Sequence, residues 1–261
     1  MTKIKDISGS LEEFAPLQLQ ENYDNAGLII GNPETEVNAI LFCLDSTEEV
    51  IEEAIQKKCN LVIAHHPIIF TGLKKIQNQH YVEKTVRKAI KNDIAIYASH
   101  TNLDNVYLGV NNKIAEKLDL INTKILRVKE DEMTGAGLIG ELRESLNESE
   151  FLEKVKKAMS IEVLRHSDFL NRKIKKVALC GGAGSFLIKD AIMENADAFI
   201  TGDVKYHEFF EANFEILLLD IGHYESERFT IEIFHKVLSG KFPNIALQFS
   251  EVNTNPINYS T

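Results

Sequence analysis

The stretch LFCLDSTEEVIEEAIQKKCNLVIAHH, residues 41–66, decides the fold class. Its start belongs to an apolar run, residues 39–44, which is too short for a helix and suits a buried strand. Ser46 and Glu49 follow with capping-box spacing, which predicts the start of a helix. A second apolar run, residues 61–64, comes after that helix. Strand, helix and strand in this order are typical of an α/β protein.

The same pattern occurs a second time in the chain. A shift of 137 residues places residues 40–70 over residues 177–207 without a gap, so that ALCGGAGSFLIKDAIMENADAFITGD, residues 178–203, matches the stretch above. The identical pairs are Cys43 and Cys180, Ile51 and Ile188, Ala54 and Ala191, Ile55 and Ile192, and Ile63 and Ile200. Shared α/β patterning alone can produce a few identities, but the matching lengths of strand, turn and helix favour an internal repeat.

The chain offers one polar seam between the two repeats. No Pro/Ser-rich linker separates two halves, and residues 129–134 form the clearest polar interruption. The sequence therefore predicts a first α/β repeat over residues 1–128 and a second over residues 129–261. The two are expected to be intertwined, with one compact unit as the alternative to two.

Each repeat also carries a histidine and an acid four residues apart. His100 follows the apolar run at residues 94–98, and His223 follows the run at residues 216–219. Asp104 and Glu227 come four residues later, so both elements are related by a step of 123 residues. Sites in open α/β sheets lie at the carboxyl ends of the strands, which is where both elements are predicted to be. The competing interpretations are a helix cap for Asp104 and a favourable charge at a helix start for the second element.

A histidine pair follows a third strand. His65 and His66 come directly after LVIA and precede a proline, so both rings can turn toward one point. Hydrogen-bonded loop histidines are the structural alternative. Taken together, three histidines and two carboxylates exceed what one tetrahedral zinc needs and fit a pair of divalent ions. The predicted metal ligands are His65, His66, Asp104, His223 and Glu227. Mixed nitrogen and oxygen ligands favour zinc, iron, manganese or nickel over calcium.

Composition narrows the class of protein. The chain has 29 Lys+Arg against 39 Asp+Glu, a net charge of −10, which argues against a dedicated nucleic-acid or membrane-surface binder. No apolar run is long enough to span a bilayer, and the start of the chain lacks the apolar core of a signal peptide. The three cysteines form no CxxC pair. We therefore expect a cytoplasmic protein with buried free thiols.

Several ordered motifs resemble those of the NGG-interacting-factor-three-like proteins, often named GTP cyclohydrolase 1 type 2 homologues. The motifs are ENYDNAGLIIG, VIAHHP, SHTNLD, GGAGS, ITGDVKYHEF, DIGHYESE and NTNP. The resemblance implies two intertwined α/β repeats with mixed sheets, a dinuclear metal site between them that Glu227 bridges, and a toroidal homohexamer. Tyr23 stands where the family usually has Trp, and the chain is the short form without the inserted domain of many members.

These observations predict a dinuclear divalent-metal protein that acts as a hydrolase. The family label suggests a nucleotide-like, phosphoester or cyclic-amide substrate. His100, which the ligand shells do not require, is the candidate general acid or base, and His207 is a candidate substrate contact. The turn at residues 181–185 suits either an anion or close strand–helix packing, and Asp45 suits a helix cap or a support for a ligand. The alternative function is a metal-binding or interaction scaffold without turnover.

Overall fold

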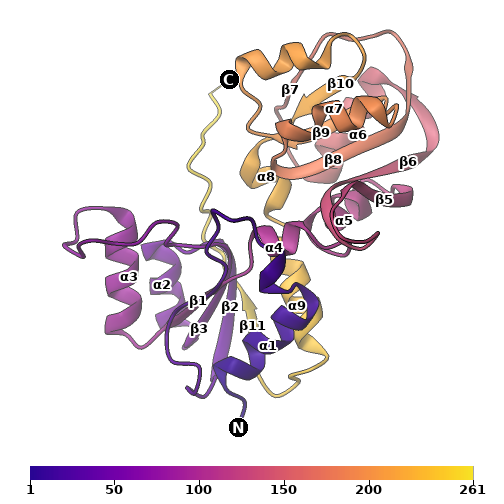
Figure 1. Cartoon of the computed structure of the whole chain (residues 1–261). Coiled ribbons are helices and arrows are strands. Elements are labelled where there is room, and N and C mark those ends of the chain that lie inside the picture. The colour runs from indigo at the N-terminus through magenta and orange to yellow at the C-terminus, as the bar shows by residue number, and fades with distance from the viewer. Residues whose placement is uncertain (261) are drawn as a thin grey trace. The chain divides into compact units, whose positions relative to one another are not determined.

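The computed structural model describes residues 1–260 and contains two compact units. Unit 1 comprises residues 1–103 and 230–258, and unit 2 comprises residues 104–229 with the end of the chain. The chain thus builds most of unit 1, then all of the folded part of unit 2, and returns to complete unit 1 (Figure 1). Within residues 1–260 no helix is both long and apolar enough to cross a membrane.

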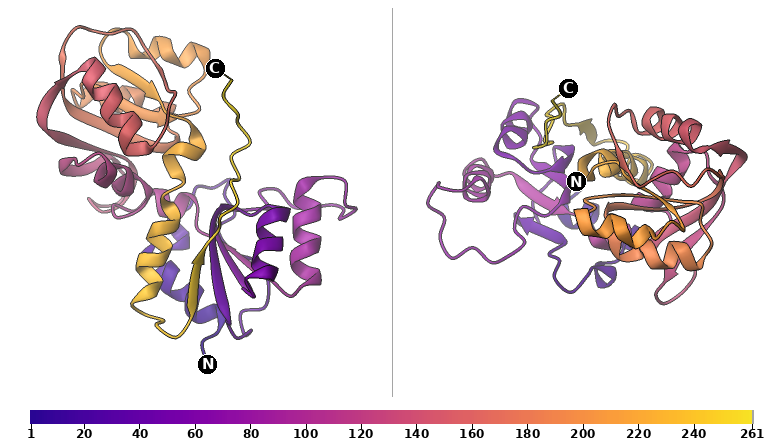
Figure 2. Two further views of the ribbon diagram at one scale, coloured as in Figure 1. Left: turned by 180° about the vertical axis from the view of Figure 1, so that it is seen from behind. Right: turned by 90° about the horizontal axis from the view of Figure 1, so that it is seen from above.

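Unit 1 is a five-stranded mixed sheet with helices on both faces. The strand order is β1-β4-β3-β2-β11, in which only the β1–β4 pair is antiparallel. Helices α2 and α3 pack together on one side of the sheet and α1 and α9 on the other, as Figures 1 and 2 show. Its elements are α1 (Ile4–Phe14), η1 (Leu17–Leu19), β1 (Gly27–Ile30), β2 (Ala39–Asp45), α2 (Glu48–Gln56), β3 (Leu61–His66), α3 (Tyr81–Lys91), β4 (Ala95–Ala98), α9 (Thr230–Ser239) and β11 (Ala246–Phe249).

Unit 2 is a six-stranded mixed sheet in the order β5-β6-β8-β9-β10-β7. Strands β8, β9 and β10 run parallel, and the other pairs are antiparallel. Its elements are α5 (Val110–Lys117), β5 (Ile121–Val128), β6 (Gly135–Asn147), α6 (Glu148–Met159), β7 (Arg165–His166), β8 (Lys173–Ala183), η2 (Ser185–Leu187), α7 (Ile188–Met193), β9 (Ala198–Gly202), η3 (Tyr206–Ala212), β10 (Leu217–Asp220) and α8 (His223–Glu227). The short helix α4 (Thr101–Asp104) spans the first chain crossing between the units.

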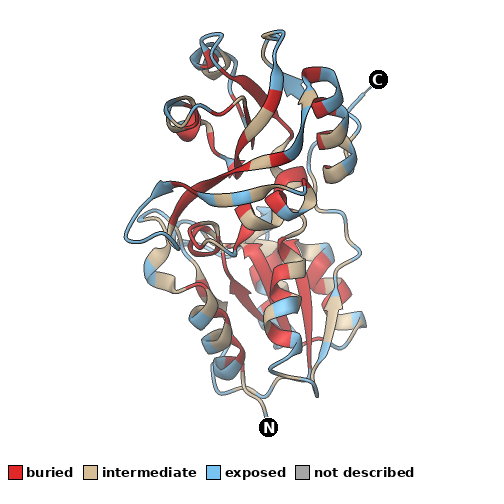
Figure 3. Ribbon diagram, turned by 90° about the vertical axis from the view of Figure 1, so that its right-hand side faces the viewer, coloured by how far each residue is buried: buried red, intermediate tan, exposed pale blue. Residues whose placement is uncertain are grey.

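The predicted α/β class with mixed sheets is confirmed, and the pairing of β8 with β9 follows the predicted repeat as far as Leu179, after which its register shifts. Ile40 pairs with Leu61 in unit 1, and Val177 pairs with Ala198 in unit 2, so both partners are shifted by 137 residues. The central strands of both sheets are apolar and buried, whereas many outward helix positions are exposed (Figure 3). Burial of this surface supplies the main driving force for folding, at about 25 cal/mol per Å².

The units divide the chain at places other than the predicted seam. Residues 129–134 form the turn between β5 and β6 inside unit 2, closed by a 2.9 Å hydrogen bond from Lys129 N to Thr134 O. Polar residues occur in hairpin turns as well as in linkers, so the polar composition of residues 129–134 did not distinguish a turn from a boundary between repeats. The helix cap of α2 also differs from the prediction, because Thr47 rather than Ser46 accepts the hydrogen bond from Val50 N.

Candidate metal-binding residues in the two units

In unit 1, three histidine rings gather at the carboxyl ends of β3 and β4. His65 and His66 end β3, and His100 follows β4 by two residues. The ring centroids lie 4.9 Å apart for His65 and His66, 5.3 Å for His65 and His100, and 5.4 Å for His66 and His100. One ring nitrogen from each lies within 4.8 Å of those of the other two. The parallel strands bring the three rings to one edge of the sheet, as the sequence predicted.

Each of these rings is oriented by an acceptor behind it. His65 Nδ1 lies 2.8 Å from the Ser99 carbonyl oxygen, and His66 Nδ1 lies 2.7 Å from Asp45 Oδ1. His100 Nδ1 lies 2.7 Å from Asp24 Oδ1. Carbonyl and ionised carboxylate oxygens only accept, so Nδ1 carries the proton in each neutral ring. The nitrogen with the lone pair is then Nε2, as in metal sites where a carboxylate or carbonyl orients the ligating histidine.

The support behind His100 is the most extensive. The carboxylate of Asp24 accepts hydrogen bonds from His100 Nδ1, from Thr101 N at 3.0 Å and from the Thr101 hydroxyl. Burial opposes ionisation of Asp24, but these hydrogen bonds outweigh it and lower the pKa of the carboxyl to about 2. Asp24 is therefore ionised at neutral pH and fixes the tautomer of His100.

Asp45 behaves in the same way beside His66. Burial would raise its pKa, but the hydrogen bond from His66 outweighs this, and the pKa lies below its ordinary value. Thr254, in the C-terminal NTNP motif, donates its hydroxyl to Asp45 Oδ2 at 2.6 Å. Of the two interpretations left open for Asp45, the structure therefore favours support of His66.

In unit 2, helix α8 carries a histidine and an acid on one face. His223 Nε2 lies 3.0 Å from Glu227 Oε2, one helical turn away. His223 Nδ1 lies 2.7 Å from Asp203 Oδ2, so this ring is oriented like the three in unit 1. Ser226 fixes the helix to β8, since its hydroxyl accepts from Gly182 N at 2.9 Å.

Two glycines of β8 lie beside the segments that carry the acids. A Cβ added at Gly182, where φ is +60°, would collide with Glu227 Oε1 and would lie 3.3 Å from His223 Cε1. Gly181 N donates to Asn111 Oδ1 at 2.9 Å, and Asn111 Nδ2 donates to the Asp104 carbonyl oxygen at 3.0 Å. This contact holds the backbone of Asp104 to the same end of β8. The glycine-rich turn thus serves close packing against a carboxylate, in agreement with the packing interpretation.

The thiol of Cys180 is a weaker candidate for a metal ligand than the histidines and acids described above. Burial, followed by the negative charges of Asp104 and Glu227, raises the pKa of Cys180 above its ordinary range. A thiol in this state keeps its proton and is a poor nucleophile or metal ligand. Cys43, Cys59 and Cys180 are all buried and free, and burial was predicted for Cys43 and Cys180 from the apolar runs that contain them.

The donor set therefore fits a divalent transition ion on chemical grounds. Neutral imidazole Nε2 atoms and carboxylates are the ligands that zinc, iron, manganese and nickel accept. The space that Gly182 leaves for Glu227 is a second indication, since any larger residue would displace that carboxylate.

His207 lies apart from these contacts. It is exposed on η3, and its described ring contacts are with Tyr206, at 5.1 Å, and Phe210, at 6.4 Å. Asp24 and Asp203, which orient His100 and His223, were not predicted from the sequence. Each lies in a motif quoted above, but neither has the short spacing to its histidine that identifies a pair.

Comparison with known proteins places the chain in a family. The model of Duf34/NIF3 (NGG1p interacting factor 3) matches residues 2–256. The chain belongs to the Duf34/NIF3 family. It is 35% identical to the GTP cyclohydrolase 1 type 2 homolog of Clostridium acetobutylicum, over 98% of both chains.

Solved structures of Duf34/NIF3 relatives share the fold. The Staphylococcus aureus hypothetical protein SA1388 superposes with a TM-score of 0.93 at 31% identity, over 99% of both chains. A Bacillus cereus protein related to NIF3 gives a TM-score of 0.93 at 27% identity, covering 100% of this chain and 99% of the other. The family resemblance predicted from the motifs is thereby confirmed.

Proposed function

We propose that this Duf34/NIF3 protein binds two divalent metal ions in one centre and is a metal-dependent hydrolase of the cytoplasm. The observation that carries the proposal is the common orientation of four histidines. His65, His66, His100 and His223 each have Nδ1 against an oxygen acceptor, which assigns Nε2 as the nitrogen for a metal or a proton. Such repeated support is expected of ligands and of catalytic imidazoles.

The covalent chain supports a single centre built from both units. Helix α4 leads from His100 to Asp104 across the crossing between residues 103 and 104. The return crossing, between residues 229 and 230, comes two residues after Glu227. Consecutive Cα atoms lie about 3.8 Å apart, so both crossings tether ligand-bearing segments to unit 1. The residues that would hold the ions are His65, His66, Asp104, His223 and Glu227.

The protein's own residues account for proton transfer and positioning. Bound divalent ions would polarise a phosphoryl or carbonyl oxygen and make water more acidic. His100 is the general acid or base, because its Nε2 can take a proton while ionised Asp24 stabilises the resulting imidazolium through Nδ1. Asp203 and Asp45 hold the rings of His223 and His66 in one orientation through hydrogen bonds to Nδ1.

The substrate class rests on the relatives. The curated relatives from Clostridium acetobutylicum and Clostridium perfringens are both named GTP cyclohydrolase 1 type 2 homolog. A nucleotide-like, phosphoester or cyclic-amide substrate is therefore the class to examine first, with His207 as a candidate substrate contact.

A substrate panel on metal-loaded protein tests hydrolysis. Nucleoside triphosphates, phosphomonoesters, phosphodiesters and cyclic amides are incubated with protein loaded with zinc, iron, manganese or nickel, and products are measured by mass spectrometry. We expect turnover with one class, abolished by chelation and restored by metal. Tight loading with two ions but no turnover of any class would favour the metal-binding scaffold instead.

We also propose that the chain forms a homohexameric ring. A closed symmetric assembly is the usual form of a homo-oligomer. Light scattering should give about six times the 29.5 kDa of one chain. A mass equal to one chain at all concentrations would contradict this assembly.

A further inference from the structure

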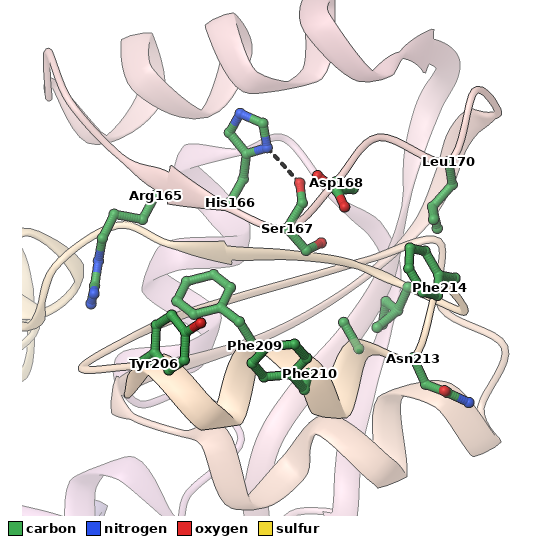
Figure 4. Close-up of a pocket in the computed structure, with 12 residues that line it drawn as sticks. Arg165, His166, Ser167, Asp168, Leu170, Tyr206, Phe209, Phe210, Asn213 and Phe214 are labelled. Carbon is green, nitrogen blue, oxygen red and sulfur yellow. Dashed lines mark hydrogen bonds between the residues drawn. The ribbon is translucent and has the colours of Figure 1, made fainter.

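Unit 2 contains a cavity that the metal-binding residues do not use. It has a volume of about 580 Å³, within the range of about 300–1,000 Å³ typical of small-molecule sites. One wall is the segment from Arg165 to Leu170, and the other is η3 with the loop that follows it (Figure 4).

The η3 wall is aromatic and highly exposed. Tyr206, Phe209 and Phe210 rise from η3 toward the cavity, and Phe214 lies toward its other end (Figure 4). Tyr206, Phe210 and Phe214 are 73%, 67% and 78% exposed. The rings of Tyr206 and Phe210 lie 5.6 Å apart, so they leave adjoining apolar area in water, and exposed apolar patches of this kind mark binding or interaction sites.

The opposite wall is held rigidly by backbone contacts. Strand β7 pairs with β10, and Ser167 both donates from its N to Leu218 O at 2.9 Å and accepts Leu218 N at its hydroxyl at 3.0 Å. The Glu148 carboxylate accepts from Leu170 N at 2.6 Å and from Asn171 N at 3.0 Å. The cavity is thus part of the folded unit rather than a gap between loose side chains.

The backbone at the far end of the cavity is strained. Asn213 and Phe214 both have left-handed φ, of +48° and +56°. A bulky aromatic residue rarely adopts this conformation, and such residues cluster at sites that clamp ligands.

Arg165, whose guanidinium is ion-paired with the buried Asp220 carboxylate, supplies hydrogen-bond donors at one end of the cavity. Its guanidinium lies 5.6 Å from the Phe209 ring, and its Nη2 donates to Asp220 Oδ2 and to Val204 O, the latter at 3.0 Å. Those described bonds engage one of its three nitrogens, and the side chain is 60% exposed. An arginine held in this way keeps accessible donors for a carboxylate, sulfonate or phosphate group.

We propose that this pocket binds a planar aromatic anion. The ring of the ligand lies against Tyr206, Phe209 and Phe210, and its anionic group binds the Arg165 guanidinium. This site is independent of the proposed hydrolase, because it requires no metal.

Titration calorimetry tests the proposal. The full chain, with EDTA present, is titrated with 2-naphthoate and with its neutral analogue 2-naphthamide. The two probes share one ring system and differ in charge, so no variant is needed to examine Arg165. We expect 2-naphthoate to bind at least about fivefold more tightly than the amide. Equal affinities for the two probes would show that Arg165 does not bind the anionic group, and would contradict the proposal of an anion site. If neither probe binds, the proposal is wrong.

Two phenylalanine variants locate the ring. Phe210→Ala should weaken 2-naphthoate binding about two- to tenfold, the loss expected for an aromatic contact. Phe186→Ala is the matched control, since Phe186 is 55% exposed in the same unit and lies beside Arg127, outside the pocket. If Phe210→Ala alters the sedimentation coefficient and leaves 2-naphthoate affinity unchanged, the aromatic face is a contact between copies of the chain and the proposal is wrong.

Discussion

The first two parallel strands of the two repeats start in the same register but differ at their carboxyl ends, because the pairing of β8 with β9 shifts between Leu179 and Ala183 while that of β2 with β3 stays regular to Asp45. In unit 1, Asp45 orients the ring of His66. A shift of 137 residues places Asp203 of unit 2 over His66, and Gly182 over Asp45. Asp203 supports His223, and Gly182 makes room for Glu227. The first repeat therefore carries a proposed ligand, His66, at the end of its second strand, whereas the second repeat carries there the aspartate that supports His223 of α8.

The third strands differ by one residue. Ala98 pairs with Ala64 and Asp220 pairs with Thr201, so the strands β4 and β10 are related by 122 residues, while His100 and His223 are related by 123. The extra residue lies between Asp220 and His223, in the segment that contains Gly222, the N-cap of α8 with φ of +89°. His223 is thereby not the structural equivalent of His100, which agrees with different roles for the two rings.

The first prediction concerns this difference in role and has the largest expected effect. Replacing His100 with Gln should retain both metal ions and lower turnover on the order of a hundredfold or more, since a general acid or base is lost. Metal content and steady-state rate on the substrate identified by the panel are measured together. Loss of metal from this variant would make His100 a ligand, equivalent after all to His223.

The second prediction concerns Gly182, which occupies in the second repeat the position that Asp45 occupies in the first. In Gly182→Ala the new methyl group collides with the Glu227 carboxylate, and the alanine must adopt the left-handed φ of +60° that Gly182 has. Metal affinity should fall about a hundredfold, as measured by competition with a chelator. Gly9→Ala, at a position with open space around the added Cβ, is the control and should bind metal like the wild type. Unchanged affinity in Gly182→Ala would show that Glu227 is not held against β8 when metal binds.

The third prediction compares the two supporting aspartates. Asp45→Asn and Asp203→Asn keep the size of each side chain but remove its charge behind His66 and His223. Each should lower metal affinity about 10- to 100-fold, the usual effect of losing such a support. If only one of the two variants is affected, only that repeat contributes a ligand.

The fourth prediction concerns stability and pH. Since the folded-state pKa of Asp24 is about 2, below its ordinary 3.8, its ionised form stabilises unit 1 above about pH 4. That contribution is lost as the pH falls toward 2. Asp24→Asn should therefore lower the free energy of unfolding of metal-free protein by about 1 kcal/mol at pH 6, a value that allows for solvent screening of a half-buried group. The difference should shrink at pH 3 in urea titrations, and a difference independent of pH would contradict this origin.

Much of the fold could be predicted from local pattern. Short apolar runs identified the central strands, and the 137-residue shift anticipated the pairing of Ile40 with Leu61 and of Val177 with Ala198. The gathering of His65, His66 and His100 followed from the rule that parallel strands end at one edge. These features depend on residues near one another in sequence, or on strand order.

Features that depend on distant contacts could not be predicted. Asp24 lies 76 residues before His100, and Asp203 lies 20 residues before His223, so no spacing connects either pair. Composition alone also could not show whether residues 129–134 are a linker or a hairpin turn, because polar residues suit both. The return of residues 230–258 to unit 1 leaves no composition signal, since β11 is an ordinary short strand.

The metal content of one histidine variant from each unit shows whether both repeats contribute ligands to one metal centre. Elemental analysis should find about two divalent ions per wild-type chain, and His65→Ala and His223→Ala should each reduce that number while the thermal melting profile of metal-free protein stays unchanged. A reduction in both variants supports one centre built by both repeats. Wild-type metal content in either variant would show that its unit contributes no ligand, and would contradict the account.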